Sequence, residues 1–183
     1  MSKWLRRYAI ASRQKHRAHS KKQFLSFEMA KTVGITFKAE KGVLPHEVTS
    51  TLCFLAKKNI RCTALGYYDG KTVPDTLIGI PLVVMFSNQD VNWYGRPISG
   101  GALSFLQEKF DIVIDFCRDA KTYPYPLQFV VSTVQASMLV GGVFYAHCPY
   151  DLIVDAQQVC DTKGYVEQVN HYISSISSPQ GGR

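Results

Sequence analysis

FDIVIDF at residues 110–116 decides the fold, and YDLIVDA at residues 150–156 repeats its pattern. Each stretch begins with an aromatic residue and Asp, continues with three aliphatic residues, and reaches a second Asp at the same spacing. Nearly continuous aliphatic runs of this length are typical of parallel strands that are buried on both faces of a sheet. We therefore predict that both stretches are strands with Asp residues at their ends.

Other strands and helices are predicted to alternate with these two. Three further runs are β-branched, aromatic or aliphatic and indicate strands: residues 32–37 (TVGITF), 62–68 (CTALGYY) and 81–86 (PLVVMF). Helices are expected after Pro45, with Val48, Leu52, Leu55 and Ala56 on one face, and after Ser99 as a possible cap. This alternation predicts one α/β domain with a mostly parallel sheet and helices on both faces.

Two helices are expected in the second half of the chain. Leu127, Val130, Val131, Val134 and Met138 follow helical spacing, and Gly141-Gly142 is expected to end that helix. A last helix is expected to have Asp161 or Thr162 as its cap and to place Val166, Val169, Ile173 and Ile176 on one face. Trp93 and Tyr94 are expected to be buried, because large aromatic side chains usually are, with an exposed stacking surface as the alternative.

Positive charge is concentrated at the start of the chain, in residues 1–23, which we call the basic arm. The arm holds eight of the 21 Lys and Arg residues and no acidic residue, so 13 cations face 14 anions in the rest of the chain. The net charge of +7 is therefore a property of the arm. We expect three parts: the arm as a helix at 1–23, the α/β domain at 24–176 and a flexible tail at 177–183.

An arm with this composition predicts an anionic partner, with RNA or a ribonucleoprotein first and an acidic membrane surface as the alternative. The arm could also dock on its own domain or mediate self-association. The residues predicted to contact the partner are Lys3, Trp4, Arg6, Arg7, Tyr8, Arg13, Lys15, Arg17, Lys21 and Lys22.

A second possible site lies at the carboxyl ends of the predicted strands, where α/β sheets bind small molecules or nucleotides. The polar residues expected there are Ser87, Asn88, Asp90, Asp115, Arg118 and Asp119. The chain after the first strand reads FKAEKGVLPHE (37–47), without a glycine-rich phosphate-binding signature. The sequence predicts no catalytic residue, metal site or cofactor, and we expect a binding module rather than an enzyme.

The composition indicates a cytoplasmic protein. The five Cys residues include no C-x-x-C pair, which suits reduced thiols better than a disulfide framework. The apolar part of the arm is too short for a secretory signal, and the run at 78–86 is too short to cross a bilayer.

The order of several segments resembles a family of small uncharacterised bacterial proteins. These segments are TVGITF (32–37), DVNWYGRPI (90–98), FDIVIDF (110–116), VQASMLVGG (134–142) and YDLIVD (150–155). The resemblance implies a single Rossmann-like domain behind a basic N-terminal helix. It implies no activity and supplies no catalytic residue.

Overall fold

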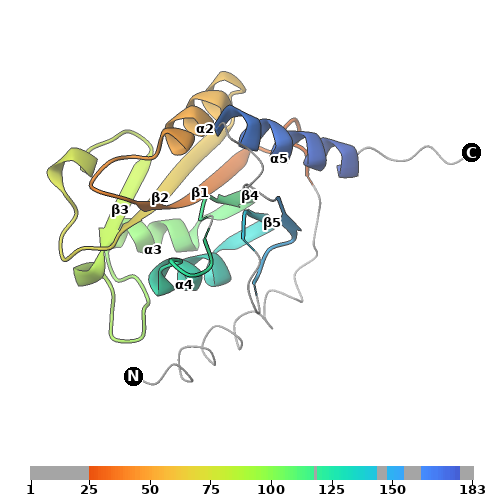
Figure 1. Ribbon diagram of the computed structural model, residues 1–183. Helices are drawn as coiled ribbons and strands as arrows, with labels where there is room; N and C mark the ends of the chain where they lie inside the picture. The colour runs from red at the N-terminus through yellow and green to blue at the C-terminus, as the bar shows by residue number, and fades with distance from the viewer. Residues whose placement is uncertain (1–24, 118, 144–147, 155–161, 178–183) are drawn as a thin grey trace, which may run out of the picture.

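The computed structural model describes residues 25–117, 119–143, 148–154 and 162–177 (Figure 1). Within these ranges, six parallel strands form one sheet in the order β3-β2-β1-β4-β5-β6. The strands are β1 (Thr32–Ala39), β2 (Arg61–Tyr68), β3 (Val83–Ser87), β4 (Lys109–Asp115), β5 (Gln135–Gly141) and β6 (Leu152–Ile153). The predicted parallel sheet is confirmed.

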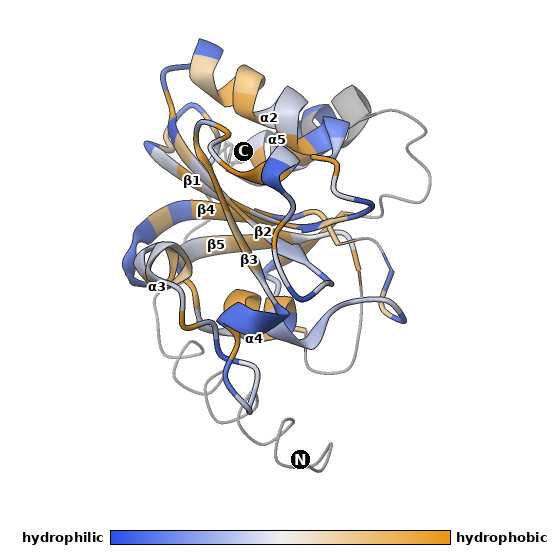
Figure 2. Cartoon of the chain, turned by 90° about the vertical axis from the view of Figure 1, so that its left-hand side faces the viewer, coloured by the Kyte–Doolittle hydropathy of each residue, from blue (hydrophilic) through white to orange (hydrophobic). Residues whose placement is uncertain are grey.

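Helices cover both faces of the sheet, as predicted. The helix α2 (His46–Lys57) lies with α5 (Thr162–Ser177) on one face, while α3 (Gly100–Gln107) and α4 (Tyr125–Thr133) lie on the other (Figures 1 and 2). Two short 3-10 turns, η1 (Asp75–Leu77) and η2 (Asn88–Asp90), flank β3. No helix in the described ranges is long and apolar enough to span a bilayer.

The strand β4 shows why its sequence is continuously aliphatic. Ile112 and Ile114 belong to the hydrophobic core on the α2 and α5 side, whereas Val113 belongs to the core on the α3 and α4 side. All three side chains are fully buried. A central parallel strand meets a helical layer on each face, so every position along it must be apolar.

The first Asp of FDIVIDF and the first Asp of YDLIVDA have the same structural role, at the starts of β4 and β6. Asp111 Oδ2 accepts hydrogen bonds from the backbone amides of Lys31 (2.7 Å) and Thr32 (3.0 Å), at the start of the neighbouring strand. In the same way, Asp151 Oδ2 accepts a hydrogen bond from the Leu139 amide of β5 at 2.8 Å. Each Asp therefore ties its strand to the preceding neighbour in the sheet.

The prediction of a helix from Leu127 to Gly141 was wrong for the second half of this segment. The helix α4 ends at Thr133, and the next residues form β5, which pairs with β4 from Lys109↔Gln135 to Asp115↔Gly141. The spacing of Val134 and Met138 fits a helix, but pairing with β4 satisfies the backbone of this apolar segment in the middle of the sheet. Tertiary pairing has overridden the local pattern.

Smaller departures occur at several other positions. The third strand begins at Val83 and not at residue 81, and β6 has two paired residues where a longer strand was expected. Ala56, expected on the buried face of α2, is exposed. The last helix runs from Thr162 to Ser177, so Thr162 lies inside it, and Asp161, the other expected cap, lies outside the described residues.

The expected burial of Trp93 was wrong. Its side chain is 74% exposed, while the ring of Tyr94 is partly buried and lies 6.4 Å from that of Phe129 in α4. The basic arm, Arg118 and the tail at 178–183 lie outside the described residues.

Candidate functional site

A crevice opens at the centre of the sheet, beyond the carboxyl ends of β1 and β4. These strands are neighbours and pair at Thr36↔Asp115, but β1 leads to α2 on one face and β4 leads to α4 on the other. Because the two connections diverge, a hollow remains between them; this is the switch point at which open α/β sheets bind ligands. The hollow has a volume of about 540 Å³.

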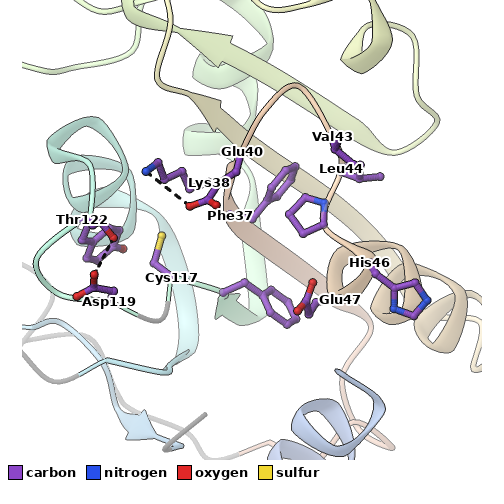
Figure 3. Close-up of a pocket in the computed structure, with 13 residues that line it drawn as sticks. Phe37, Lys38, Glu40, Val43, Leu44, His46, Glu47, Cys117, Asp119 and Thr122 are labelled. Carbon is purple, nitrogen blue, oxygen red and sulfur yellow. Dashed lines mark hydrogen bonds and ion pairs between the residues drawn. The ribbon is translucent and has the colours of Figure 1, made fainter. Parts of the chain in front are cut away.

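The crevice has aromatic and aliphatic walls with polar groups at its rim (Figure 3). Phe37, near the end of β1, and Leu44, ahead of α2, line the hollow (Figure 3). Phe116, after β4, and Pro45 also line it. The polar lining residues are Lys38, Glu40, His46, Glu47, Asp119 and Thr122. Apolar walls with a few polar groups are typical of small-molecule sites.

Local interactions orient two parts of the polar rim. The Nζ atom of Lys38 lies 3.8 Å from a carboxylate oxygen of Glu40. On the opposite wall, Asp119 accepts hydrogen bonds from the Lys121 amide (2.8 Å) and the Thr122 hydroxyl (3.1 Å). The Lys121 amide is the main reason that the pKa of Asp119 is lowered, so this carboxylate is ionised at neutral pH.

Asp115 lies beneath the crevice and is fully buried. One of its oxygens accepts hydrogen bonds from the Thr36 hydroxyl at 2.7 Å and the Cys117 amide at 3.4 Å. The other accepts hydrogen bonds from the Tyr123 hydroxyl at 2.6 Å and the Tyr150 hydroxyl at 2.5 Å. Asp115 thus holds together β1, the β4–α4 connection and the segment before β6.

The ionisation of Asp115 and Cys117 is governed by burial. Burial raises the pKa of the Asp115 carboxyl, and the hydrogen bonds from Tyr123, Tyr150 and Thr36 oppose that shift. Burial, and then the proximity of Asp115, raise the pKa of the Cys117 thiol well above its usual value. The thiol lines the crevice but stays protonated at neutral pH, whereas nucleophilic attack requires a thiolate.

The sequence-predicted crevice residues are found in two separate places. Asp119 lines the crevice and Asp115 supports it from below. Ser87, Asn88 and Asp90 lie at the end of β3, which the strand order separates from β4 by two strands. There, Asp90 caps η2 by accepting hydrogen bonds from the amide (2.9 Å) and hydroxyl (3.0 Å) of Ser87.

Several lining residues were missed from the sequence, notably Phe37, Lys38 and His46. Phe37 and Lys38 lie near the end of β1 and His46 begins α2, and the only signal there was the strand followed by Pro45. Among the described residues, no group of three or more His, Cys, Asp and Glu side chains is placed to hold a metal ion.

The strand order 3-2-1-4-5-6, with all strands parallel and helices on both faces, defines a Rossmann-like α/β protein. The chain belongs to a family of unknown function, DUF6913, which it matches over residues 2–176. No curated protein matches it.

Two solved structures resemble this chain. An exopolyphosphatase-related protein from Bacteroides fragilis matches with a TM-score of 0.52 and 11% identity, over 91% of this chain and 45% of that one. This likeness shows the fold, and the chain spans less than half the length of that protein. An NAD-dependent formate dehydrogenase from Staphylococcus aureus matches with a TM-score of 0.33 and 14% identity, over 98% of this chain and 59% of that one.

Proposed function

We propose that this protein is a binding module that holds a small organic molecule in the crevice between β1 and β4. The observation that carries the proposal is the hollow of about 540 Å³ at the switch point of the sheet. Ligand sites of small molecules typically have volumes of about 300–1,000 Å³, so the hollow has a suitable size.

The lining supports a ligand with a flat apolar part rather than a polyphosphate. The half-buried Phe116 offers aromatic surface, with the buried Phe37 also in the lining, and the rim offers both donors and acceptors. A polyphosphate would meet the carboxylates of Glu40 and Glu47 near the start of α2, and Lys38 is already close to Glu40. The name of the exopolyphosphatase-related neighbour suggests phosphate chemistry, but the likeness extends to the fold alone.

A ligand screen with a blocked variant tests this proposal. Val43 lines the crevice and is 64% exposed, so Val43→Trp should obstruct the hollow with little cost in stability. Ile78, 61% exposed and outside the crevice lining, supplies the matched control Ile78→Trp. We expect uncharged aromatic compounds to raise the melting temperature of the wild type and the control, but not of Val43→Trp.

The screen should also contain nucleotides, sugar nucleotides and inorganic polyphosphate. A shift by polyphosphate that Val43→Trp abolishes would contradict the ligand chemistry proposed here. No shift with any compound, or an equal shift with Val43→Trp, would reject the crevice as a binding site.

A second candidate function is supported by the distribution of charge: the basic arm docks on RNA. Eight cations without an acidic residue precede a domain of nearly balanced charge. If these cations neutralise phosphates, the affinity should fall steeply as the salt concentration rises. A short RNA should bind the full chain and not a chain lacking residues 1–22.

Two outcomes would reject RNA as the partner of the arm. The first is affinity that is independent of salt or unchanged by the truncation. The second is flotation of the full chain with acidic liposomes in the absence of RNA binding, which would assign the arm to a membrane surface.

A further inference from the structure

The side chain of Tyr123 takes part in both the crevice and the buried hydrogen-bond network beneath it. It lines the crevice, and its hydroxyl donates a 2.6 Å hydrogen bond to Oδ2 of Asp115. The side chain is buried, so it can move only if the groups packed around it move as well. The position of Tyr123 in the crevice wall therefore depends on what holds Asp115 in place.

Tyr150 reaches the same carboxylate oxygen from outside the crevice. Its hydroxyl donates a 2.5 Å hydrogen bond to Oδ2 of Asp115, and its oxygen lies 3.3 Å from that of the Tyr123 hydroxyl. Tyr150 itself does not line the hollow. Two hydroxyls that share one buried acceptor constrain each other, because moving one of them changes the hydrogen bonding of the other.

The segment at residues 148–154, which carries Tyr150, is held to the sheet beside β5. Its strand β6 pairs through two residues, and the Asp151 amide donates a hydrogen bond to the Leu139 carbonyl at 2.8 Å. The Tyr150 ring packs against Gly141, where an added Cβ atom would overlap it. Short strands at the end of a sheet open locally at a lower free energy than the core strands. The segment can therefore leave the sheet without unfolding of the whole protein.

We propose that Tyr150 regulates the crevice. While the segment at 148–154 is docked on the sheet, Tyr150 and Asp115 fix Tyr123 in the crevice wall, and when the segment leaves the sheet this wall loosens. The inference rests on the proposed function, in which the crevice holds a small organic molecule. Coupling of this kind is reciprocal: a ligand that needs the ordered wall stabilises the docked segment, and displacement of the segment weakens ligand binding.

Three cysteines allow the coupling to be measured without a ligand. Cys117 is buried and lines the crevice, Cys148 belongs to the segment and is half-buried, and Cys62 is buried in β2, outside the crevice lining. Alkylation of each thiol by iodoacetamide at mildly alkaline pH is followed by mass spectrometry of its peptide. Global unfolding exposes Cys62 and Cys117 together, whereas local opening of the crevice wall exposes Cys117 without Cys62.

The variant Tyr150→Phe removes the hydroxyl and keeps the ring. We expect it to raise the ratio of Cys117 to Cys62 alkylation rates about tenfold, and to raise the rate for Cys148, because a hydrogen bond to a buried carboxylate is lost. Tyr67→Phe removes a hydroxyl with a 2.6 Å hydrogen bond at the end of β2 and supplies the matched control. It should leave the ratio unchanged.

Three results would overturn the inference. A rise for Cys148 without a rise for Cys117 would show that the segment moves without affecting the crevice. Equal rises for Cys117 and Cys62 would assign Tyr150 to global stability alone, and unchanged rates at all three thiols would show that its hydroxyl controls neither. The ligand screen is independent of these rates, so the binding function stands if this inference alone fails. If the screen rejects the crevice as a binding site, both are rejected.

Discussion

Polar residues follow both β4 and β3 at their carboxyl ends, but the two ends form different kinds of surface. At the end of β4, Asp115 is fully buried beneath a crevice and receives hydrogen bonds from two tyrosines. At the end of β3, Asp90 caps a short turn, and the chain then exposes Trp93. The position of each strand in the sheet accounts for this difference: β4 lies beside β1 at the centre, whereas β3 lies at an edge.

The comparison shows that strand order decides what a polar strand end can do. A central strand end is enclosed by connections that leave on opposite faces, so its polar groups must find internal partners. An edge strand end meets solvent on one side, and its loop can present side chains to a partner. The four predictions below test this difference.

The largest effect is expected from Asp115→Ala. Removing the buried carboxyl leaves the hydroxyls of Tyr123 and Tyr150 without their acceptor, so the free energy of unfolding should fall by about 3 kcal/mol. Asp90→Ala, which removes only the cap of η2, should cost about 1 kcal/mol. Urea unfolding of both variants measures the contrast, and equal losses would contradict it.

The tyrosine hydroxyls that are hydrogen-bonded at the two strand ends should contribute to the free energy of unfolding in the same order, with the larger contribution at the end of β4. Tyr150→Phe removes a 2.5 Å hydrogen bond to the buried Asp115 and should lower the free energy of unfolding by about 2 kcal/mol. Tyr67→Phe removes a 2.6 Å hydrogen bond to the neutral side-chain oxygen of Asn88 and a long one of 3.4 Å to the Asp69 carboxylate, and should cost about 1 kcal/mol. Thermal and urea unfolding compare them; a larger loss for Tyr67→Phe would reverse the ranking.

Stability should depend on pH through Asp115. Because its pKa is raised in the folded protein, the folded state binds more protons than the unfolded state between the unfolded and folded pKa values. The stability contributed by Asp115 is therefore complete below the unfolded pKa and is lost as the pH rises through the folded pKa. The loss should not exceed about 1.4 kcal/mol per pH unit.

The matched variant Asp115→Asn cannot ionise at this position. Urea titration from acidic to neutral pH measures the unfolding free energy of both proteins. The unfolding free energy of the wild type relative to that of the variant should fall as the pH rises. A difference that is independent of pH would show that Asp115 does not titrate with a raised pKa.

The smallest effect on stability is expected at the exposed Trp93, in the segment after β3. Trp93→Ala should change the free energy of unfolding by less than about 0.5 kcal/mol, since the indole is 74% exposed. Gly95→Ala, two residues away, should destabilise the protein measurably because the added methyl would overlap Tyr125. A marked loss for Trp93→Ala would show that the indole stabilises the fold.

Elements with strong local signals were predictable from the sequence. The strand β1, with its β-branched TVGITF, and the helix α2, introduced by Pro45, lie where expected. The strand β5 was not predictable, because Val134 and Met138 continue the helical spacing of α4 without a Gly or Pro between them. Only the neighbouring strand β4 makes this segment extended.

The candidate site was predictable only in part, for a related reason. Polar residues at strand ends are visible in the sequence, but the adjacency of β1 and β4 is not, so Phe37 and Lys38 were missed as lining residues. The partners of Asp115 come from residues 8 and 35 positions away, Tyr123 and Tyr150, and no local pattern connects them.

The pairing of β1 with β4 also sets an order of assembly during synthesis. Thr36 and Asp115 are 79 residues apart, whereas β1 and β2 are joined through a single helix. The β1–β2 unit can therefore form while β4 is still being made, but the crevice cannot exist until the chain has emerged beyond Tyr123. A nascent chain released or cleaved before that point would lack the binding surface altogether, so ligand binding would report completion of the central sheet.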